Sequence, residues 1–372
     1  MFVFVCAGCG AELTVPLSQV ALPAHARQKY GNGIQLPVLM EPGTFAVDPE
    51  PWGPPWRTWE EIPPDEAAER GVYAPVYVLS DAVPGAVVIA PGDVRGTLLI
   101  PEKGGGYCCG LDGADGPNMA CETCGLAVAS RIDDCSLWQA VWLDPDAVRR
   151  LAVDGTYVAP LSWAELMAEG KRTPLYEPIT TWGARPGERR WWSWSPQWEA
   201  AVGRALAHML AASEGRAVTV PDGPAAEVFQ RVLDALLPAG PPARRVLLAG
   251  PGLPAAVSVP VPDADILLVP EHPRTGEVWA PAGGADAVYS VPLPFGVWLG
   301  LAFPEPKPPV PASGVMPDGA LRDDPPLPRP HHLFRADSDT FRHTLARLLA
   351  ARSPWLREVL ANLTWHMQAG LF

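Results

Sequence analysis

The sequence predicts an α+β protein with a β-rich N-terminal module, an α/β domain and a C-terminal helical hairpin. Three observations carry this prediction. Short apolar runs alternate with turn signals up to about residue 160, apolar residues recur at helical spacing beyond residue 195, and all seven cysteines lie between residues 6 and 135. Runs of the first kind are typical of strands, and helical spacing is typical of helices that bury one face.

The length and composition predict more than one domain. A chain of 372 residues is about twice the usual domain size. A hydrophobic fraction of 48% with 19% charged residues excludes a largely disordered chain. No apolar run approaches the roughly 18 residues that span a bilayer, so we expect no membrane segment. We expect a β-rich zinc-binding module at 1–160, an α/β domain at 161–303, a proline-rich linker or arm at 304–330, and a helical hairpin at 331–372 packed on the α/β domain.

The N-terminal module is predicted to contain several short strands. Each candidate is an apolar or alternating run bounded by glycine, proline or aspartate. The expected strands are Phe2–Val5, Glu12–Val15, Val76–Leu79, Gly85–Ala90, Gly96–Ile100 and Leu126–Ser130.

The C-terminal part is predicted to mix helices with strands. Ser195 followed by Pro196 is typical of a helix start, and apolar residues at helical spacing extend this helix over 196–213. A second helix is expected at 224–237. The expected strands are Ala217–Val220, Arg245–Ala249, Ile266–Val269 and Val288–Val291. After the proline-rich arm, apolar spacing from Phe341, and again beyond Ser353-Pro354, predicts the two helices of the hairpin.

Charge is distributed unevenly and constrains the kind of partner. The net charge is −13, and residues 1–160 account for −11 of it, with 9 Lys and Arg against 20 Asp and Glu. Such a field repels polyanions, so DNA or RNA binding is disfavoured. If the N-terminal module binds another protein, we expect that partner to be neutral or basic.

The cysteines are expected to be reduced. The apolar segment Met1–Cys6 lacks the basic region of a signal peptide and is too short to serve as its apolar region, which favours a cytoplasmic location. Only four lysines stand against 24 arginines, a bias typical of GC-rich bacterial genomes. In a reducing cytoplasm, an odd number of cysteines is better explained by metal ligands or reactive thiols than by disulfides.

Four cysteines form two copies of one motif. Cys6 and Cys9 are followed by Gly10, and Cys121 and Cys124 are followed by Gly125, so both segments read C-x-x-C-G. Two residues between the thiolates let one tight turn aim both sulfurs at one ion. The glycine tolerates a positive φ and leaves backbone amides free to donate to the sulfurs.

This pair of knuckles resembles a zinc ribbon. The resemblance covers the two knuckles and their flanking strands, and it implies a closed, structural zinc site of the kind often found in modules that bind proteins or nucleic acids. The connection departs from the usual pattern, because 111 residues separate Cys9 from Cys121. We therefore expect a β subdomain inserted between the knuckles.

The other three cysteines leave several readings open. Cys108, Cys109 and Cys135 could form a second metal site with a carboxylate such as Asp112 or Asp134, or include a catalytic or redox thiol. The plainest reading is that they are small buried residues in tight loops.

A further alternative changes the zinc site itself. Cys109 and Cys135 could join Cys121 and Cys124 in one zinc set, which would leave Cys6 and Cys9 to pair elsewhere.

Two functions follow from these readings. The first is a zinc-binding adaptor whose acidic N-terminal module meets a protein partner. The second is a metal- or thiol-dependent enzyme that uses Cys108, Cys109 or Cys135 near the zinc module, with the α/β domain as substrate platform.

Overall fold

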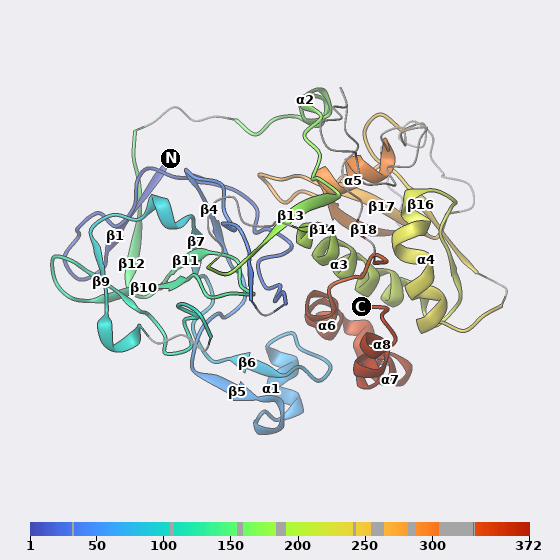
Figure 1. The fold of residues 1–372 in the computed structure, drawn as a ribbon, viewed down its shortest axis with the longest axis horizontal. Helices are drawn as coiled ribbons and strands as arrows, with labels where there is room; N and C mark the ends of the chain where they lie inside the picture. The colour runs from blue at the N-terminus through green and yellow to red at the C-terminus, as the bar shows by residue number, and fades with distance from the viewer. Residues whose placement is uncertain are drawn as a thin grey trace, which may run out of the picture.

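The chain has a mixed α/β fold with several separate sheets (Figure 1). A computed structural model describes residues 1–31, 33–104, 108–154, 159–183, 191–240, 243–253, 264–281, 288–304, 330 and 332–372. The expected proline-rich arm at 304–330 lies almost entirely outside these residues. None of the helices in the described ranges has the length and apolar character that a bilayer crossing requires.

A seven-stranded sheet forms the centre of the N-terminal part, which we define as residues 1–154. The expected strands at 85–90, 96–100 and 126–130 all lie in it. In spatial order the strands are β2 (Ser18–Gln19), β4 (Thr44–Val47), β7 (Val87–Ile89), β11 (Ala140–Leu143), β10 (Ala127–Ile132), β9 (Met119–Cys121) and β8 (Thr97–Leu99).

This sheet buries apolar side chains on both faces. Successive residues of a strand point to opposite faces, so Trp142 packs with Leu36 on one face and Leu143 packs with Phe4 on the other. The ring of Trp52 stacks on Trp142 with centroids 4.5 Å apart, which anchors the proline- and tryptophan-rich loop to the sheet. The sheet is therefore a rigid platform for the loops at its ends.

A second pair of strands covers one face of the sheet. Strand β1 (Phe2–Cys6) pairs antiparallel with β12 (Val148–Ala152). The expected strand at 12–15 is present only as isolated bridges, Val5 to Glu12 and Thr14 to Val94. The hydroxyl of Thr14 accepts the N–H of Phe4 at 3.0 Å, so a side chain replaces part of the backbone ladder there.

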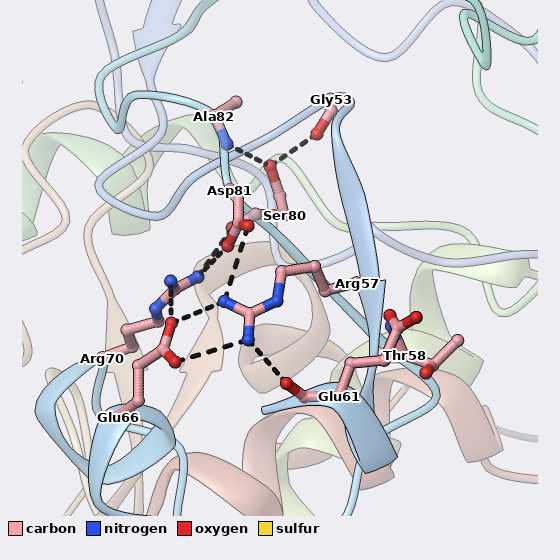
Figure 2. Close-up of polar contacts among 9 residues, drawn as sticks. All are labelled: Gly53, Arg57, Thr58, Glu61, Glu66, Arg70, Ser80, Asp81 and Ala82. Atoms are coloured by element: carbon pink, nitrogen blue, oxygen red, sulfur yellow. Dashed lines mark hydrogen bonds and ion pairs between the residues drawn. The ribbon is translucent and has the colours of Figure 1, made fainter. Parts of the chain in front are cut away.

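Residues 53–82 form a small unit with its own ion-pair network, shown in Figure 2. Strands β5 (Trp56–Thr58) and β6 (Val78–Ser80) pair, and helix α1 (Pro64–Glu69) lies between them in sequence. Arg57 Nη1 lies 2.7 Å from Glu66 Oε1 and 3.7 Å from Asp81 Oδ2. Arg70 contacts the same two carboxylates, so two cations and two anions are mutually compensated.

The C-terminal part, residues 159–372, contains a four-stranded parallel sheet. Its strands occupy the four positions predicted from sequence. In order they are β15 (Val218–Thr219), β16 (Arg244–Leu248), β17 (Ile266–Glu271) and β18 (Tyr289–Pro294). Helices α2 (Trp163–Glu169), α3 (Pro196–Ser213), α4 (Pro224–Leu236) and α5 (Phe295–Ala302) accompany this sheet.

The chain ends in helices, as predicted, but in three helices rather than two. They are α6 (Ser338–Arg347), α7 (Pro354–Ala361) and α8 (Leu363–Gln368). Asn362 separates α7 from α8 with a ψ of 4°, which interrupts the expected continuous helix. A Cβ on Gly203 of α3 would clash with the backbone oxygen of Asp337, so α3 and the start of α6 touch through their backbones.

Strands and buried polar groups join the two parts. Strand β3 (Ile34–Gln35) pairs with β13 (Tyr176–Thr181), which also pairs with β14 (Trp191–Trp194). The hydroxyl of Tyr30 lies 3.5 Å from the hydroxyl of Ser193 on β14.

The unit at 53–82 also crosses between the parts. Ile62, Val72 and Leu79 belong to the same apolar core as α3 and α6, and Tyr73 donates its N–H to the oxygen of Ala346 at 2.7 Å. In Figure 1 this unit lies beside the C-terminal helices.

Candidate metal centre

The two C-x-x-C-G knuckles meet in space. We call Cys6, Cys9, Cys121 and Cys124 the knuckle cluster. Cys6 ends strand β1 and Cys121 ends strand β9, so the two turns emerge from rigid strands. All four sulfurs lie within 4.8 Å of one another. Cys6 and Cys121 are buried in the core of the N-terminal part, whereas Cys9 and Cys124 face solvent.

The knuckles share one backbone geometry. Cys6 donates its N–H to the oxygen of Ala11, and Cys121 donates to the oxygen of Leu126, both at 2.8 Å. Gly10 and Gly125 donate their N–H groups to the backbone oxygen of the first cysteine in their own knuckle, at 2.9 and 2.8 Å.

Each glycine has a left-handed backbone, with φ of +80° and +77°. The predicted positive φ of the two glycines is confirmed, and an L-residue with a side chain would be strained in this conformation.

The sulfur spacing fits a tetrahedral ion. Four sulfurs at a zinc–sulfur distance of about 2.3 Å lie about 3.8 Å apart along each edge of the tetrahedron. The sulfur of Cys6 lies 3.6 Å from that of Cys124, and the sulfur of Cys9 lies 3.6 Å from that of Cys121. Each close pair joins the two knuckles, so an ion between them would connect residues more than 110 positions apart.

The four thiols of this cluster do not ionise alike. The N–H groups of Ala11 and Leu126 lower the pKa of Cys9 and Cys124 respectively, but burial and neighbouring thiols outweigh them and raise both, that of Cys124 to about 12. Burial raises the pKa of Cys121, but the N–H groups of Cys124 and Thr123, with neighbouring thiols, outweigh it and lower the pKa to about 7. Donors of this kind are the usual outer shell of a thiolate metal site.

The remaining cysteines form a second group. We call Cys108, Cys109, Asp134 and Cys135 the loop cluster; its four ligand atoms lie within 4.8 Å of one another. The structure thus assembles Cys109 and Cys135 with Cys108, and not with the second knuckle. Asp112 stands outside the group and accepts the N–H of Ala114 at 2.9 Å.

Asp134 is hydrogen-bonded to two cysteines of the loop cluster. Its Oδ1 accepts the N–H of Cys109 at 2.7 Å and the N–H of Cys135 at 2.8 Å. The sulfurs of Cys108 and Cys109 are 3.3 Å apart. Asp134 and Cys135 are buried, while Cys108 is exposed, so the group opens to solvent on one side.

A residue that the sequence did not single out also serves this cluster. Gly33 donates its N–H to the sulfur of Cys135 at 3.3 Å, and this bond lowers the pKa of the Cys135 thiol. Gly33 is 102 positions from Cys135, and no sequence motif links the two residues, so the contact could not be predicted from the sequence.

Comparisons with known proteins add no relative. No protein-family model, curated protein or solved structure matches this chain. The two cysteine groups are both positioned to bind a metal ion.

Proposed function

We propose that this chain is a cytoplasmic zinc-binding protein in which the knuckle cluster holds one structural zinc ion and the N-terminal part binds another protein. The observation that carries the zinc proposal is the convergence of four sulfurs from two matching turns. Four thiolates complete a tetrahedral shell, so no position is left for a substrate. Zinc also suits thiolate ligands in a reducing compartment, where disulfides are rare.

The structural role rests on what the ion would connect. Cys6 and Cys121 end strands that belong to different sheets. Bringing such distant turns together costs chain entropy, and metal binding offsets that cost with folding free energy. Zinc would therefore fix β1 and β12 against the seven-stranded sheet.

Metal analysis of the purified full chain tests this proposal. We expect zinc to co-purify, and Cys9→Ser to remove one equivalent per chain without removing other bound metal. Retention of all zinc by Cys9→Ser would contradict the knuckle cluster as a metal site.

The proposed protein-binding surface is the open edge of the seven-stranded sheet beside the second knuckle. Strand β8 (Thr97–Leu99) is the last strand of the sheet, and in the described part of the chain no strand pairs with its outer edge. Leu98 and Leu99 are 57% and 51% exposed, and Leu126 of the adjacent knuckle is 38% exposed. Edge strands with exposed apolar side chains are templates for the addition of another strand.

Charge suggests what kind of segment this edge would accept. Glu12, Glu102 and Glu122 are exposed around strand β8. The N–H of Glu122 donates to the oxygen of Gly96, directly before the strand, at 2.9 Å. We therefore propose that the partner contributes an extended, apolar segment with basic flanks.

Selection from a displayed library of random peptides tests this surface. We expect enriched peptides to alternate apolar residues with basic ones and to lose binding when Leu98→Asp is introduced. Leu349→Asp is the matched control, because Leu349 is 64% exposed in the C-terminal part. Enrichment of acidic peptides, or equal binding to both variants, would contradict the proposal.

The loop cluster favours a second candidate function, a metal- or thiol-dependent enzyme. This candidate is supported by three thiols that lie next to a buried carboxyl group, in a cluster whose Cys108 is exposed to solvent. Iodoacetamide labelling of the native, zinc-loaded protein separates the candidates. Fast, quantitative labelling of Cys108 or Cys109 would favour the enzyme, whereas protection of both would favour the adaptor.

A further inference from the structure

We infer that the loop cluster is a second zinc site, in which Cys108, Cys109 and Cys135 supply thiolates and Asp134 supplies a carboxylate oxygen. This site is distinct from the knuckle cluster and does not depend on the proposed adaptor role.

The donor set matches the chemistry of zinc. Thiolates select soft or borderline ions, and carboxylates select harder ones, so a set with three sulfurs and one oxygen suits a borderline ion such as Zn²⁺. All four ligand atoms lie within 4.8 Å of one another, which leaves room for a single ion between them. Binding would replace the protons of the three thiols, and those protons would pass to solvent.

Asp134 is a buried carboxyl group beside three thiols, where a bound cation would give it a partner. Its side chain is buried, and among the described residues it makes no ion pair. The nearest arginine in sequence, Arg131, points its Nε at Asp133 at 3.1 Å instead. Two backbone N–H groups hold Oδ1, so the carboxyl group is fixed in position beside the three sulfurs. Buried carboxylates are normally paired or bound to metal.

The backbone holds Cys135 in place for such a role. Ser136 has a left-handed backbone with a φ of +72°, which is uncommon for a residue with a side chain. Tyr30 donates its N–H to the oxygen of Ser136, and Ser136 donates its own N–H to the oxygen of Ile34, both at 2.8 Å. Tyr30 and Ile34 therefore fix the turn that carries Cys135, and Gly33 also donates to the sulfur.

Gly33 and Ile34 also contact the C-terminal part. Trp182 donates its N–H to the oxygen of Gly33 at 2.8 Å, and strand β3 (Ile34–Gln35) pairs with β13. A metal ion in the loop cluster would stabilise the turn on which this connection rests. We therefore expect the second zinc to strengthen the contact between the two parts of the chain.

Metal stoichiometry of the full chain tests the second site. We expect two equivalents of zinc in the wild type and one in the double variant Cys108→Ser/Cys109→Ser. In Co²⁺-loaded protein the thiolate charge-transfer absorption should fall by about two-fifths in the double variant, since three of seven sulfur ligands are lost. Cys9→Ser should remove the other equivalent, which separates failure of this site from failure of the knuckle cluster.

Two further measurements guard against a variant that merely misfolds. Asp134→Asn keeps the acceptor oxygen but removes the charge, and should weaken the second equivalent about tenfold or more while leaving the first unchanged. Amide exchange across residues 28–36 should slow when the second equivalent binds. A single equivalent in the wild type, or a second that survives Cys108→Ser/Cys109→Ser, would overturn the inference.

Discussion

The sulfur of Cys6 lies 3.6 Å from the sulfur of Cys124, although 118 positions separate the two residues. The contact joins the end of strand β1 to the turn after strand β9. A zinc ion placed there would lock the first strand of the chain onto the central sheet. The stability of the N-terminal part should therefore depend on this cluster.

Removing one exposed ligand should destabilise the protein. Cys124→Ser leaves the fold's packing unchanged, because Cys124 is exposed, but it breaks the four-sulfur set. We expect loss of one zinc equivalent and of several kcal/mol in the free energy of unfolding, measured with urea. Cys108→Ser is the matched control and should keep the knuckle zinc. Equal stability of Cys124→Ser and wild type would show that the ion has no structural role.

The knuckle glycines should resist substitution through backbone strain alone. Gly125 has a φ of +77°, and a Cβ built on it meets no atom within 4 Å. Gly125→Ala should therefore lower the unfolding free energy by about 1 kcal/mol, through its left-handed conformation and not through a clash.

Gly92→Ala is the control for this change. Gly92 also has open space around it but does not have the strained conformation. Thermal melting of the two variants gives the comparison, and a Gly125→Ala protein that melts with Gly92→Ala would refute the strain argument.

Stability should fall as pH rises through the range in which Glu199 ionises. Burial, and then the charge of Asp337, raise the pKa of Glu199 from 4.5 to about 8. The folded state thus binds a proton that the unfolded state has released between these values. The resulting stabilisation is complete below pH 4.5 and is lost as pH rises through about 8.

Glu199→Gln isolates this effect. Between pH 7 and pH 8 we expect the wild type to lose on the order of 1 kcal/mol relative to the variant in urea unfolding. The exposed Glu69→Gln should follow the wild type at every pH. Parallel pH profiles for wild type and Glu199→Gln would mean that Glu199 is ionised throughout.

Glu50 should stabilise the contact between the two parts. Its Oε2 lies 2.7 Å from Arg347 Nε and 3.1 Å from His343 Nε2, both on α6. Burial raises the pKa of Glu50, but the hydrogen bond from His343 and the nearby cations outweigh it and lower the pKa to about 2. Glu50→Gln should therefore cost about 1 to 3 kcal/mol near neutral pH.

This cost should shrink as pH falls from 4.5 toward 2, because protonation neutralises the wild-type carboxylate. Glu41→Gln is the control: Glu41 pairs with Lys171 at 2.7 Å across the same two parts, but both side chains are about three-quarters exposed. Such a surface pair contributes little. Equal losses in the two variants would contradict a special role for Glu50.

The elements whose structure depends on neighbouring residues could be predicted from the sequence. Helix α3 begins at Pro196 and ends at Ser213, as predicted, because a proline at the first turn and apolar spacing mark a buried helix. The knuckle turns were equally predictable, since two cysteines and a glycine fix both chemistry and backbone. Strand β3 could not be found, because two residues carry no alternation and its pairing depends on β13, over 140 positions away.

The two candidate sites differ in the same way, because one could be predicted from local motifs and the other could not. The pairing of the knuckles follows from matching motifs, whereas the grouping of Cys108 with Cys135 depends on where two loops lie after folding. Asp134 was one of two carboxylates that sequence offered, and only its bonds to two backbone amides distinguish it from Asp112. The buried carboxyl of Glu199 gave no signal, because its surroundings come from distant segments.

The packing of the unit at 53–82 indicates that the two parts of the chain cannot be separated without exposing apolar surface. Ile62, Val72 and Leu79 lie in the apolar core of the C-terminal part, although they precede that part by many positions in the sequence. A fragment that stops at residue 154 would expose these side chains to water, and its complement would keep an unfilled apolar surface. Each half expressed alone should aggregate, and co-expression should return both to solution as a non-covalent pair.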